Sequence, residues 1–228
     1  MKEKISKPSL FLHLTEIFRA AYEFIKAIIF ERKFSYHNIG NAQPIIVIPG
    51  LLTTDLSTTL LRTFLTKLGF NVFGWGMGRN LGRLESLPIL IEKVEKINEA
   101  HQQKIIIIGW SMGGIFTREI AKARPELVKR TITMGSPFAD VNAPNWAKWI
   151  FDILNKGIVI DDAFVAQLPN PAPVPTLALY SKLDGIVPWR ACMETFEDEI
   201  HTNMEIKSSH IGMGANPEVM KIIYSALK

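Results

Sequence analysis

The stretch KIIIIGWSMGG, from Lys104 to Gly114, decides the fold. Four consecutive isoleucines running into a glycine predict a buried β-strand. The residues from 112 to 124 then predict a helix that ends before Pro125. Ser111 therefore lies between a strand and a helix. It is either a nucleophile held at the end of a strand or a small residue in a tight turn, and the rest of the chain has to decide.

The same alternation of strand and helix recurs on both sides of this stretch. Short apolar runs predict strands at 44–50, 70–75, 129–137, 175–181 and 204–209. Helical spacing covers about 54–68, 84–102 and 217 to the last residue. Such an order predicts an α/β fold with a mostly parallel sheet of about six strands and helices on both faces. Ligands in these sheets bind beyond the carboxyl ends of the strands.

The pattern is interrupted between the fourth and fifth predicted strands. The segment NAPNWAKWIFDILNKG (142–157) predicts an inserted amphipathic helix, and PNPAPVP (169–175) predicts a stiff return. We expect residues of about 138–172 to form a short lid on a single domain spanning 35–228.

Residues 1–34 precede this domain and predict one amphipathic helix. The apolar positions follow helical spacing, and they are Leu10, Leu14, Ile17, Ala21, Phe24 and Ile28. Four charged residues, two acids and two bases, interrupt the segment too often for a signal peptide or a membrane span. The helix either packs on protein, its own domain or a second copy, or contacts a membrane surface through residues 9–30. The mixed charge disfavours the membrane alternative.

Composition excludes several classes of function. The formal net charge of the 228 residues is +4, and no basic block indicates a nucleic-acid partner. Cys192 is the single cysteine, which rules out an intrachain disulfide and is compatible with a reducing compartment. We expect a cytoplasmic protein, with membrane association left open. No residue spacing suggests a metal. The glycines at 76, 78 and 82 lack the spacing of a dinucleotide loop, so we expect no cofactor.

Gly109-Trp110-Ser111-Met112-Gly113 matches the G-x-S-x-G pattern of a nucleophile elbow, in the required strand-to-helix setting. A serine nucleophile needs a histidine base and an acid that orients it, in the chain order Ser, Asp, His. Asp184 follows the predicted fifth strand and His210 the sixth, so both would reach the edge where Ser111 lies. The alternatives fit this order less well, and they are Asp140, Asp161, Asp162, His13, His37, His101 and His201.

The tetrahedral intermediate of such a reaction needs two backbone N–H donors. One is expected from Met112, the residue after the nucleophile. The other is expected from Leu51, in the loop IPGLLTTD that follows the first strand.

These segments, together with MGSPF, SKLDGIVPW and SSHIGM, resemble the α/β-hydrolase superfamily from about Pro44 onward, and within it compact bacterial lipases and carboxylesterases. Those enzymes often carry H-G-L-x-G-T-D at the oxyanion loop, where this chain has Pro49 and Thr53 in place of the His and the second Gly. Trp110 before the serine is similar to carboxylesterases with G-W-S-x-G-G. The resemblance implies a serine esterase or lipase-like enzyme.

Aromatic residues on the predicted loops and lid are candidates for an apolar acyl pocket, with core packing as the alternative. They are Trp75, Trp110, Phe138, Trp146 and Trp149. We therefore expect cleavage of a small-molecule ester with an apolar acyl or alcohol part, through an acyl-enzyme on Ser111. An acyltransferase or thioesterase with the same triad, and a non-catalytic lipid- or partner-binding protein, remain as alternatives. Oligomeric state and natural substrate cannot be read from the sequence.

Overall fold

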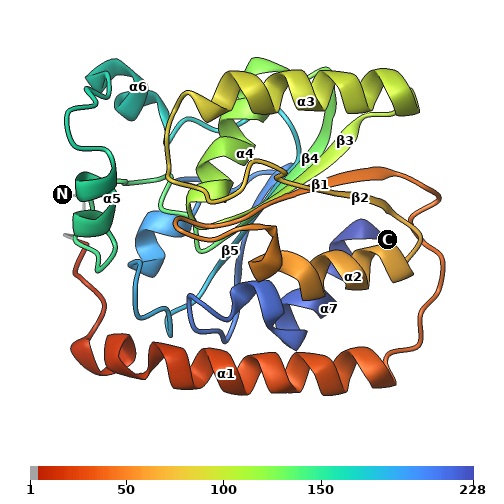
Figure 1. Cartoon of the computed structure of the whole chain (residues 1–228), viewed down its shortest axis with the longest axis horizontal. Helices are drawn as coiled ribbons and strands as arrows, with labels where there is room; N and C mark the ends of the chain where they lie inside the picture. Colours follow the sequence, from red (N-terminus) through yellow and green to blue (C-terminus); the bar gives the residue numbers. More distant parts are fainter. Residues whose placement is uncertain (1–4) are drawn as a thin grey trace.

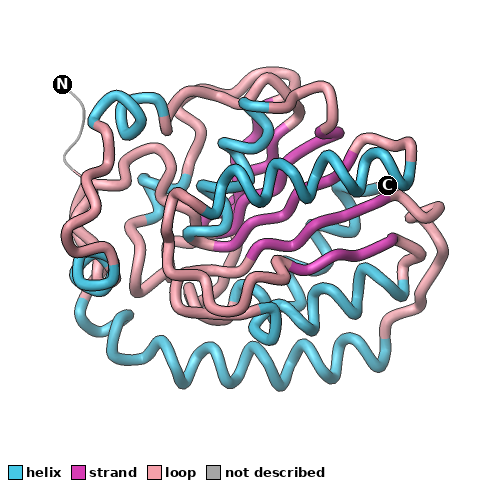
Figure 2. The backbone as a smooth tube through the Cα atoms, turned by 45° about the horizontal axis from the view of Figure 1, so that its top comes forward, coloured by secondary structure: helices cyan, strands magenta, loops and turns pink. Residues whose placement is uncertain are grey.

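The computed structural model describes residues 5–228 and contains one six-stranded sheet in the order β2-β1-β3-β4-β5-β6 (Figure 2). All five neighbouring pairs are parallel. The strands are β1 (Pro44–Ile48), β2 (Asn71–Gly74), β3 (Ile105–Trp110), β4 (Val128–Met134), β5 (Thr176–Tyr180) and β6 (His201–Glu205). The predicted α/β architecture is confirmed.

Helices cover both faces of the sheet (Figure 1). One face carries α2 (Thr59–Lys67) and α7 (Pro217–Leu227), with α1 (Leu10–Lys33) outside them. The other carries α3 (Ser86–His101) and α4 (Met112–Ala123). The inserted segment holds two short helices, α5 (Lys148–Leu154) and α6 (Asp162–Gln167). Three 3-10 turns complete the elements, η1 (Asp55–Thr58), η2 (Trp189–Cys192) and η3 (Met213–Ala215).

The central strands are buried on both faces, and their side chains alternate between two cores. Ile45 and Val47 of β1 pack with α2 and α7, whereas Ile46 and Ile48 pack with α3 and α4. The isoleucines of β3 divide in the same way. This two-sided burial explains why these strands are continuous apolar runs instead of alternating ones.

The last strand lies earlier than predicted. β6 runs from His201 to Glu205, and His201 pairs with Thr176 at its start. The residues after Glu205 form a loop, and a side chain holds its backbone: the hydroxyl of Ser181 donates to the carbonyl of Ser208 at 2.7 Å and accepts from its N–H at 3.2 Å. The predicted strand 204–209 therefore begins three residues too late and includes part of this loop.

The apolar positions of α1 face away from the domain, although an amphipathic helix that packs on its own domain is expected to turn them inward. Its apolar positions Leu10, Leu14 and Ile17 are 55%, 66% and 71% exposed, whereas Glu16 is 2% exposed. The inward side combines Glu16 and Glu23, which accept hydrogen bonds from the domain, with Ala27 and Phe30, which pack on its core. None of the helices in the described part of the chain is long and apolar enough to cross a membrane.

Candidate active site

Ser111 occupies the turn between β3 and α4 with a strained backbone, φ 54° and ψ −122°. A non-glycine residue in such a region costs about 1–3 kcal/mol and persists only where its surroundings enforce it. Two glycines allow the close packing that does so. A Cβ on Gly109 would lie 2.3 Å from the carbonyl oxygen of Gly113, and a Cβ on Gly113 would lie 2.3 Å from that of Ile48. The serine N–H donates to the Met134 carbonyl at 2.8 Å.

The structure brings Ser111, His210 and Asp184 into one hydrogen-bonded chain. His210 Nε2 lies 3.0 Å from Ser111 Oγ, and His210 Nδ1 lies 2.6 Å from Asp184 Oδ2. The second carboxylate oxygen of Asp184 accepts from the N–H groups of Ile186 and Val187 at 2.8 and 2.7 Å. Asp184 thus fixes the imidazole with its proton on Nδ1, and Nε2 is free to accept the serine proton.

The electrostatics of His210 favour its cationic form. Burial disfavours the imidazolium and lowers its pKa, but the charge of Asp184, its hydrogen bond and the charge of Glu16 outweigh that loss, so the pKa of His210 is raised above its ordinary value. Stabilising the imidazolium is what a base needs at the moment it takes a proton from serine.

The alternative residues have other partners. His13 stacks on Trp146, and His201 contacts Asp198 through Nδ1 at 2.9 Å. Asp161 caps α6. The remaining four make no hydrogen bond to the serine. Asp140 accepts from the Asn142 N–H, Asp162 lines the pocket, His101 lies at the end of α3 beside Phe73, and His37 is exposed. In the described part of the chain, the histidine hydrogen-bonded to Ser111 is His210.

The loop after β1 places Leu51 beside the nucleophile. The N–H of Leu52 donates to the Asn80 carbonyl at 2.7 Å and that of Thr53 to the Gly50 carbonyl at 3.2 Å, so neither is free for a ligand. Leu51 and Met112 both line the pocket that contains Ser111. Their N–H groups are the candidates for an oxyanion hole.

The buried side chain of Asn80, in the glycine-rich segment 76–82, supports this loop. The buried amide of Asn80 donates to the Pro49 carbonyl at 2.8 Å and accepts from the Gly82 N–H at 2.9 Å. Asp55 holds the start of the segment 76–82, because its carboxylate accepts from the N–H groups of Trp75 and Gly76 at 2.6 and 2.8 Å.

Two carboxylates of α1, which no sequence pattern predicts, also reach the site. Glu16 Oε1 accepts from the N–H of Gly185 at 2.6 Å and from that of His210 at 3.1 Å, and its Oε2 accepts from Ile211 at 3.2 Å. Glu23 accepts from the backbone and hydroxyl of Ser209 at 2.8 and 3.0 Å. Their partners lie 169 to 195 residues away in the chain, so no local pattern reveals them.

A pocket of about 490 Å³ opens at Ser111 between the sheet edge and the inserted segment. Its apolar wall includes Leu51, Met112, Ile115, Phe151, Phe164 and Leu168, and its polar wall includes Asn145, Lys148, Asp152, Asn155, Lys156 and Asp162. The segment from Val141 to Leu168, which lies within the predicted lid 138–172, supplies most of the lining.

None of the five predicted pocket aromatics lines this pocket. Trp75 and Phe138 are buried in the core, and Trp110 is buried with its indole N–H donating to the His210 carbonyl at 3.0 Å. Trp146 stacks on His13 of α1, and Trp149 is 60% exposed. Trp75, Phe138 and Trp110 therefore pack in the core, which was the alternative, because large side chains at strand ends fill the space between the sheet and its helices.

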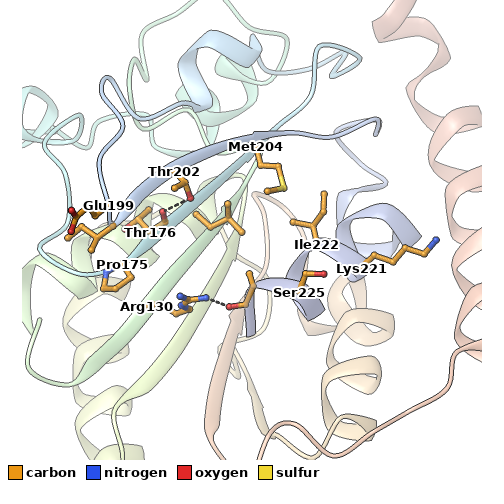
Figure 3. A pocket seen from close by; sticks show the side chains of 12 residues that line it. Arg130, Pro175, Thr176, Glu199, Thr202, Met204, Lys221, Ile222 and Ser225 are labelled. Atoms are coloured by element: carbon orange, nitrogen blue, oxygen red, sulfur yellow. Dashed lines mark hydrogen bonds between the residues drawn. The ribbon is translucent and has the colours of Figure 1, made fainter. Parts of the chain in front are cut away.

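A second hollow lies away from Ser111, at the amino ends of β5 and β6 (Figure 3). Arg130, Thr176, Thr202 and Lys221 are among the residues that line it, and the three proposed catalytic residues are not. Its volume of about 620 Å³ exceeds that of the pocket at Ser111, but it offers no nucleophile held by a base.

No family model matches the chain. Solved structures do. The mature form of the Bacillus licheniformis lipase BlEst2 superposes with a TM-score of 0.60 at 18% identity, over 86% of this chain and 96% of that one. In the propeptide form of the same lipase, the match covers 51% of that chain. The naproxen esterase (carboxylesterase NP) of Bacillus subtilis gives 0.58 at 16%, over 92% and 98%. A thioesterase domain from the curacin biosynthetic pathway gives 0.53 at 16%, over 81% and 90%. The chain has the α/β-hydrolase fold, and its structural neighbours are lipases, esterases and thioesterases.

Proposed function

We propose that the protein is a serine hydrolase that cleaves carboxylic esters through an acyl-enzyme intermediate on Ser111. The observation that carries this proposal is the continuous chain from Ser111 Oγ to His210 Nε2 at 3.0 Å and from His210 Nδ1 to Asp184 at 2.6 Å, at the mouth of a pocket. The lipases and esterases among the structural neighbours support the same reaction class.

In the first half-reaction, Ser111 Oγ attacks the ester carbonyl carbon while His210 Nε2 takes the serine proton. Negative charge develops on the carbonyl oxygen, and the N–H groups of Leu51 and Met112 stabilise it together with the positive end of α4. The tetrahedral intermediate collapses, the C–O bond to the alcohol breaks, and His210 returns the proton to the departing alcohol.

The second half-reaction repeats these steps with water. His210 takes a proton from the water as it attacks the acyl carbon, and the C–O bond to Ser111 breaks as the serine regains its proton. Asp184 stays ionised throughout and stabilises the imidazolium that forms twice in each cycle.

The pocket favours an ester with an apolar acyl group. Its volume lies within the range of about 300–1,000 Å³ that holds small-molecule ligands. The apolar side chains of Leu51, Ile115 and Phe151 lie on the same cavity as Ser111. The charged residues come from the inserted segment, so that side of the cavity suits a polar alcohol part or solvent.

The test is hydrolysis of a p-nitrophenyl ester series from short to long acyl chains, with acyl-coenzyme A thioesters in parallel. We expect turnover by the wild-type chain and none by Ser111→Ala, whereas the matched control Ser225→Ala, which changes an exposed serine on α7, retains it. Thioester cleavage faster than ester cleavage would favour a thioesterase, and release of product only with an added alcohol would favour an acyltransferase. A folded wild-type chain that turns over none of them would contradict the proposal and favour a binding protein.

A further inference from the structure

The side of α1 that faces away from the domain is apolar. Its exposed large residues are Leu10, Phe11, Leu14, Ile17, Phe18, Tyr22, Phe24, Ile25 and Ile29, a set called the outer face below. Phe11 and Phe18 are 74% and 77% exposed. The helix lies along one side of the molecule for most of its length (Figure 1). Soluble monomers rarely expose so large a contiguous apolar patch unless it binds something.

The structure sorts the charges of α1 by side. All three acids of the helix have partners on the protein: Glu16 and Glu23 bind the loop around His210, and Glu31 pairs with Lys67 at 2.7 Å. The bases Lys26, Arg32 and Lys33 are exposed. The charges of α1 therefore divide by side: the inward side holds the acids together with Arg19, which pairs with Glu16, and the charges of the outward side are basic.

We infer that the outer face docks on an anionic lipid bilayer, with the helix lying in the plane of the headgroups. At about 1.5 Å per residue, its 24 residues extend about 36 Å along the surface. Aromatic and aliphatic side chains enter the acyl boundary, and the flanking bases meet anionic headgroups. In a pair of copies, parallel or antiparallel, the bases of one helix would find no acid on the facing helix, so charge complementarity favours lipid.

Docking by α1 would hold the proposed active site close to the membrane. The indole N–H of Trp146 donates to the Pro8 carbonyl at 3.1 Å, and its ring stacks on His13 at 4.3 Å. The inserted segment that lines the pocket is thereby attached to the start of α1. The membrane inference itself does not depend on catalysis.

The test is co-sedimentation of the full chain with vesicles of phosphatidylcholine alone and of equal parts phosphatidylcholine and phosphatidylglycerol. The test variant combines Phe11→Ser, Phe18→Ser and Ile25→Ser, and the control is Leu56→Ser, which changes a residue that is 81% exposed outside α1. We expect binding to the anionic vesicles that weakens with salt, and at least a roughly tenfold lower partition coefficient in the test variant alone.

Equal sedimentation of the test variant and the wild type, or no sedimentation of the wild type on either vesicle, would overturn the inference. A wild-type dimer in sedimentation velocity that the test variant loses would assign the outer face to a second copy and overturn it as well. Melting curves by circular dichroism verify that the variants fold.

The inward side of α1 carries a second inference, which rests on the proposed function. Glu16 joins two loops at once, because one carboxylate accepts from the N–H of Gly185, next to Asp184, and from those of His210 and Ile211. The same carboxylate pairs with Arg19 at 2.9 Å. We propose that Glu16 is a positioning residue that keeps the Asp184 and His210 loops in register for catalysis and adds negative charge beside the imidazole.

Glu16→Gln tests this role against the control Glu31→Gln on the same helix. The amide removes the charge and turns one acceptor oxygen into a donor that faces backbone N–H groups. We expect kcat on a p-nitrophenyl ester to fall roughly tenfold with little change in KM, and the acidic limb of kcat/KM to move to lower pH. A purely structural residue would not move that limb.

An active Glu16→Gln variant with the wild-type kcat and pH profile would overturn the role of Glu16 and leave the proposed function standing. A wild-type chain without turnover would contradict the proposed function instead. If the variant is poorly folded, Glu16→Asp replaces it, because the shorter acid keeps the charge and we then expect the pH limb to stay while kcat falls.

Discussion

The two walls of the pocket at Ser111 are built in opposite ways. The wall at the sheet edge consists of loops that follow strands β1 to β5. Behind Ser111 in this wall, Asp184 and His210 are 4% and 5% exposed and are held by hydrogen bonds. The opposite wall is the segment around α5 and α6, which has no fully buried residue within either helix and leaves Trp149 and Ile153 exposed. We expect substitutions of the hydrogen-bonded residues at the sheet edge to reduce activity strongly. We expect the short helices of the inserted segment to tolerate substitution.

The largest effect is expected at the sheet edge. Asp184→Asn keeps the shape of the side chain but removes the charge and lets the amide donate to His210, which favours the wrong imidazole tautomer. We expect kcat to fall about 10⁴-fold, as in other serine triads. Steady-state kinetics on a p-nitrophenyl ester measure it, and Asp140→Asn, which changes an alternative acid, is the control. Loss of activity in both variants alike would assign no special role to Asp184.

A buried ion pair lies at the base of the inserted segment. Arg118 of α4 pairs with Glu194, donates to the Asn170 carbonyl at 2.9 Å and lies 3.8 Å from the ring centre of Phe138. Both charges are fully buried, so removing one of them leaves the other uncompensated. We expect Glu194→Leu to lower the free energy of unfolding by about 3–5 kcal/mol in urea denaturation.

The double variant Arg118→Met with Glu194→Leu separates charge from packing in this ion pair. It removes both charges, and we expect it to be more stable than Glu194→Leu alone. A double variant as unstable as the single one would show that packing, not the unpaired charge, dominates at the base of the inserted segment.

The pH dependence of the proposed reaction follows from His210. Only the neutral imidazole accepts a proton, and the charge of Asp184 raises the pKa of His210. As pH falls through that raised pKa the base is protonated, so kcat/KM declines on the acid side at a pH above the ordinary histidine value of about 6.5. A pH–rate profile measures the limb. An acid limb below about pH 6.5 would mean that burial lowers the pKa of His210 by more than Asp184 and Glu16 raise it.

The smallest effect is expected at the opposite wall. Phe151 of α5 lines the pocket beside Leu51, and Phe151→Ala enlarges the cavity without removing a side-chain hydrogen bond. We expect the preferred acyl chain to lengthen and selectivity between neighbouring chain lengths to change by roughly tenfold, with kcat on the best substrate retained. Val159→Ala, at a residue 93% exposed and outside the lining set, is the control. An unchanged chain-length profile would place the acyl group elsewhere.

The proposed catalytic residues at the sheet edge could be predicted from the sequence, whereas the directions of the aromatic side chains and the contacts of Glu16 could not. The carboxyl ends of parallel strands meet at one edge, so identifying the strands before Ser111, Asp184 and His210 was enough to expect the three side chains to meet, even though β6 was placed too late. The direction of Trp75 and Trp110 was not predictable, because it depends on which face of the sheet each strand end turns to. Glu16 had no signal, since its partners come from the far end of the chain.

The most direct measurement is labelling by a fluorophosphonate ester, which phosphonylates an activated serine, in the wild type, Ser111→Ala and His210→Gln. We expect rapid modification of one serine in the wild type, assigned to Ser111 by peptide mass spectrometry. We expect no labelling of Ser111→Ala, and labelling of His210→Gln slowed by at least about 10²-fold. Labelling at a different serine, or a folded wild-type chain that resists the reagent, would contradict the role of Ser111 as the nucleophile.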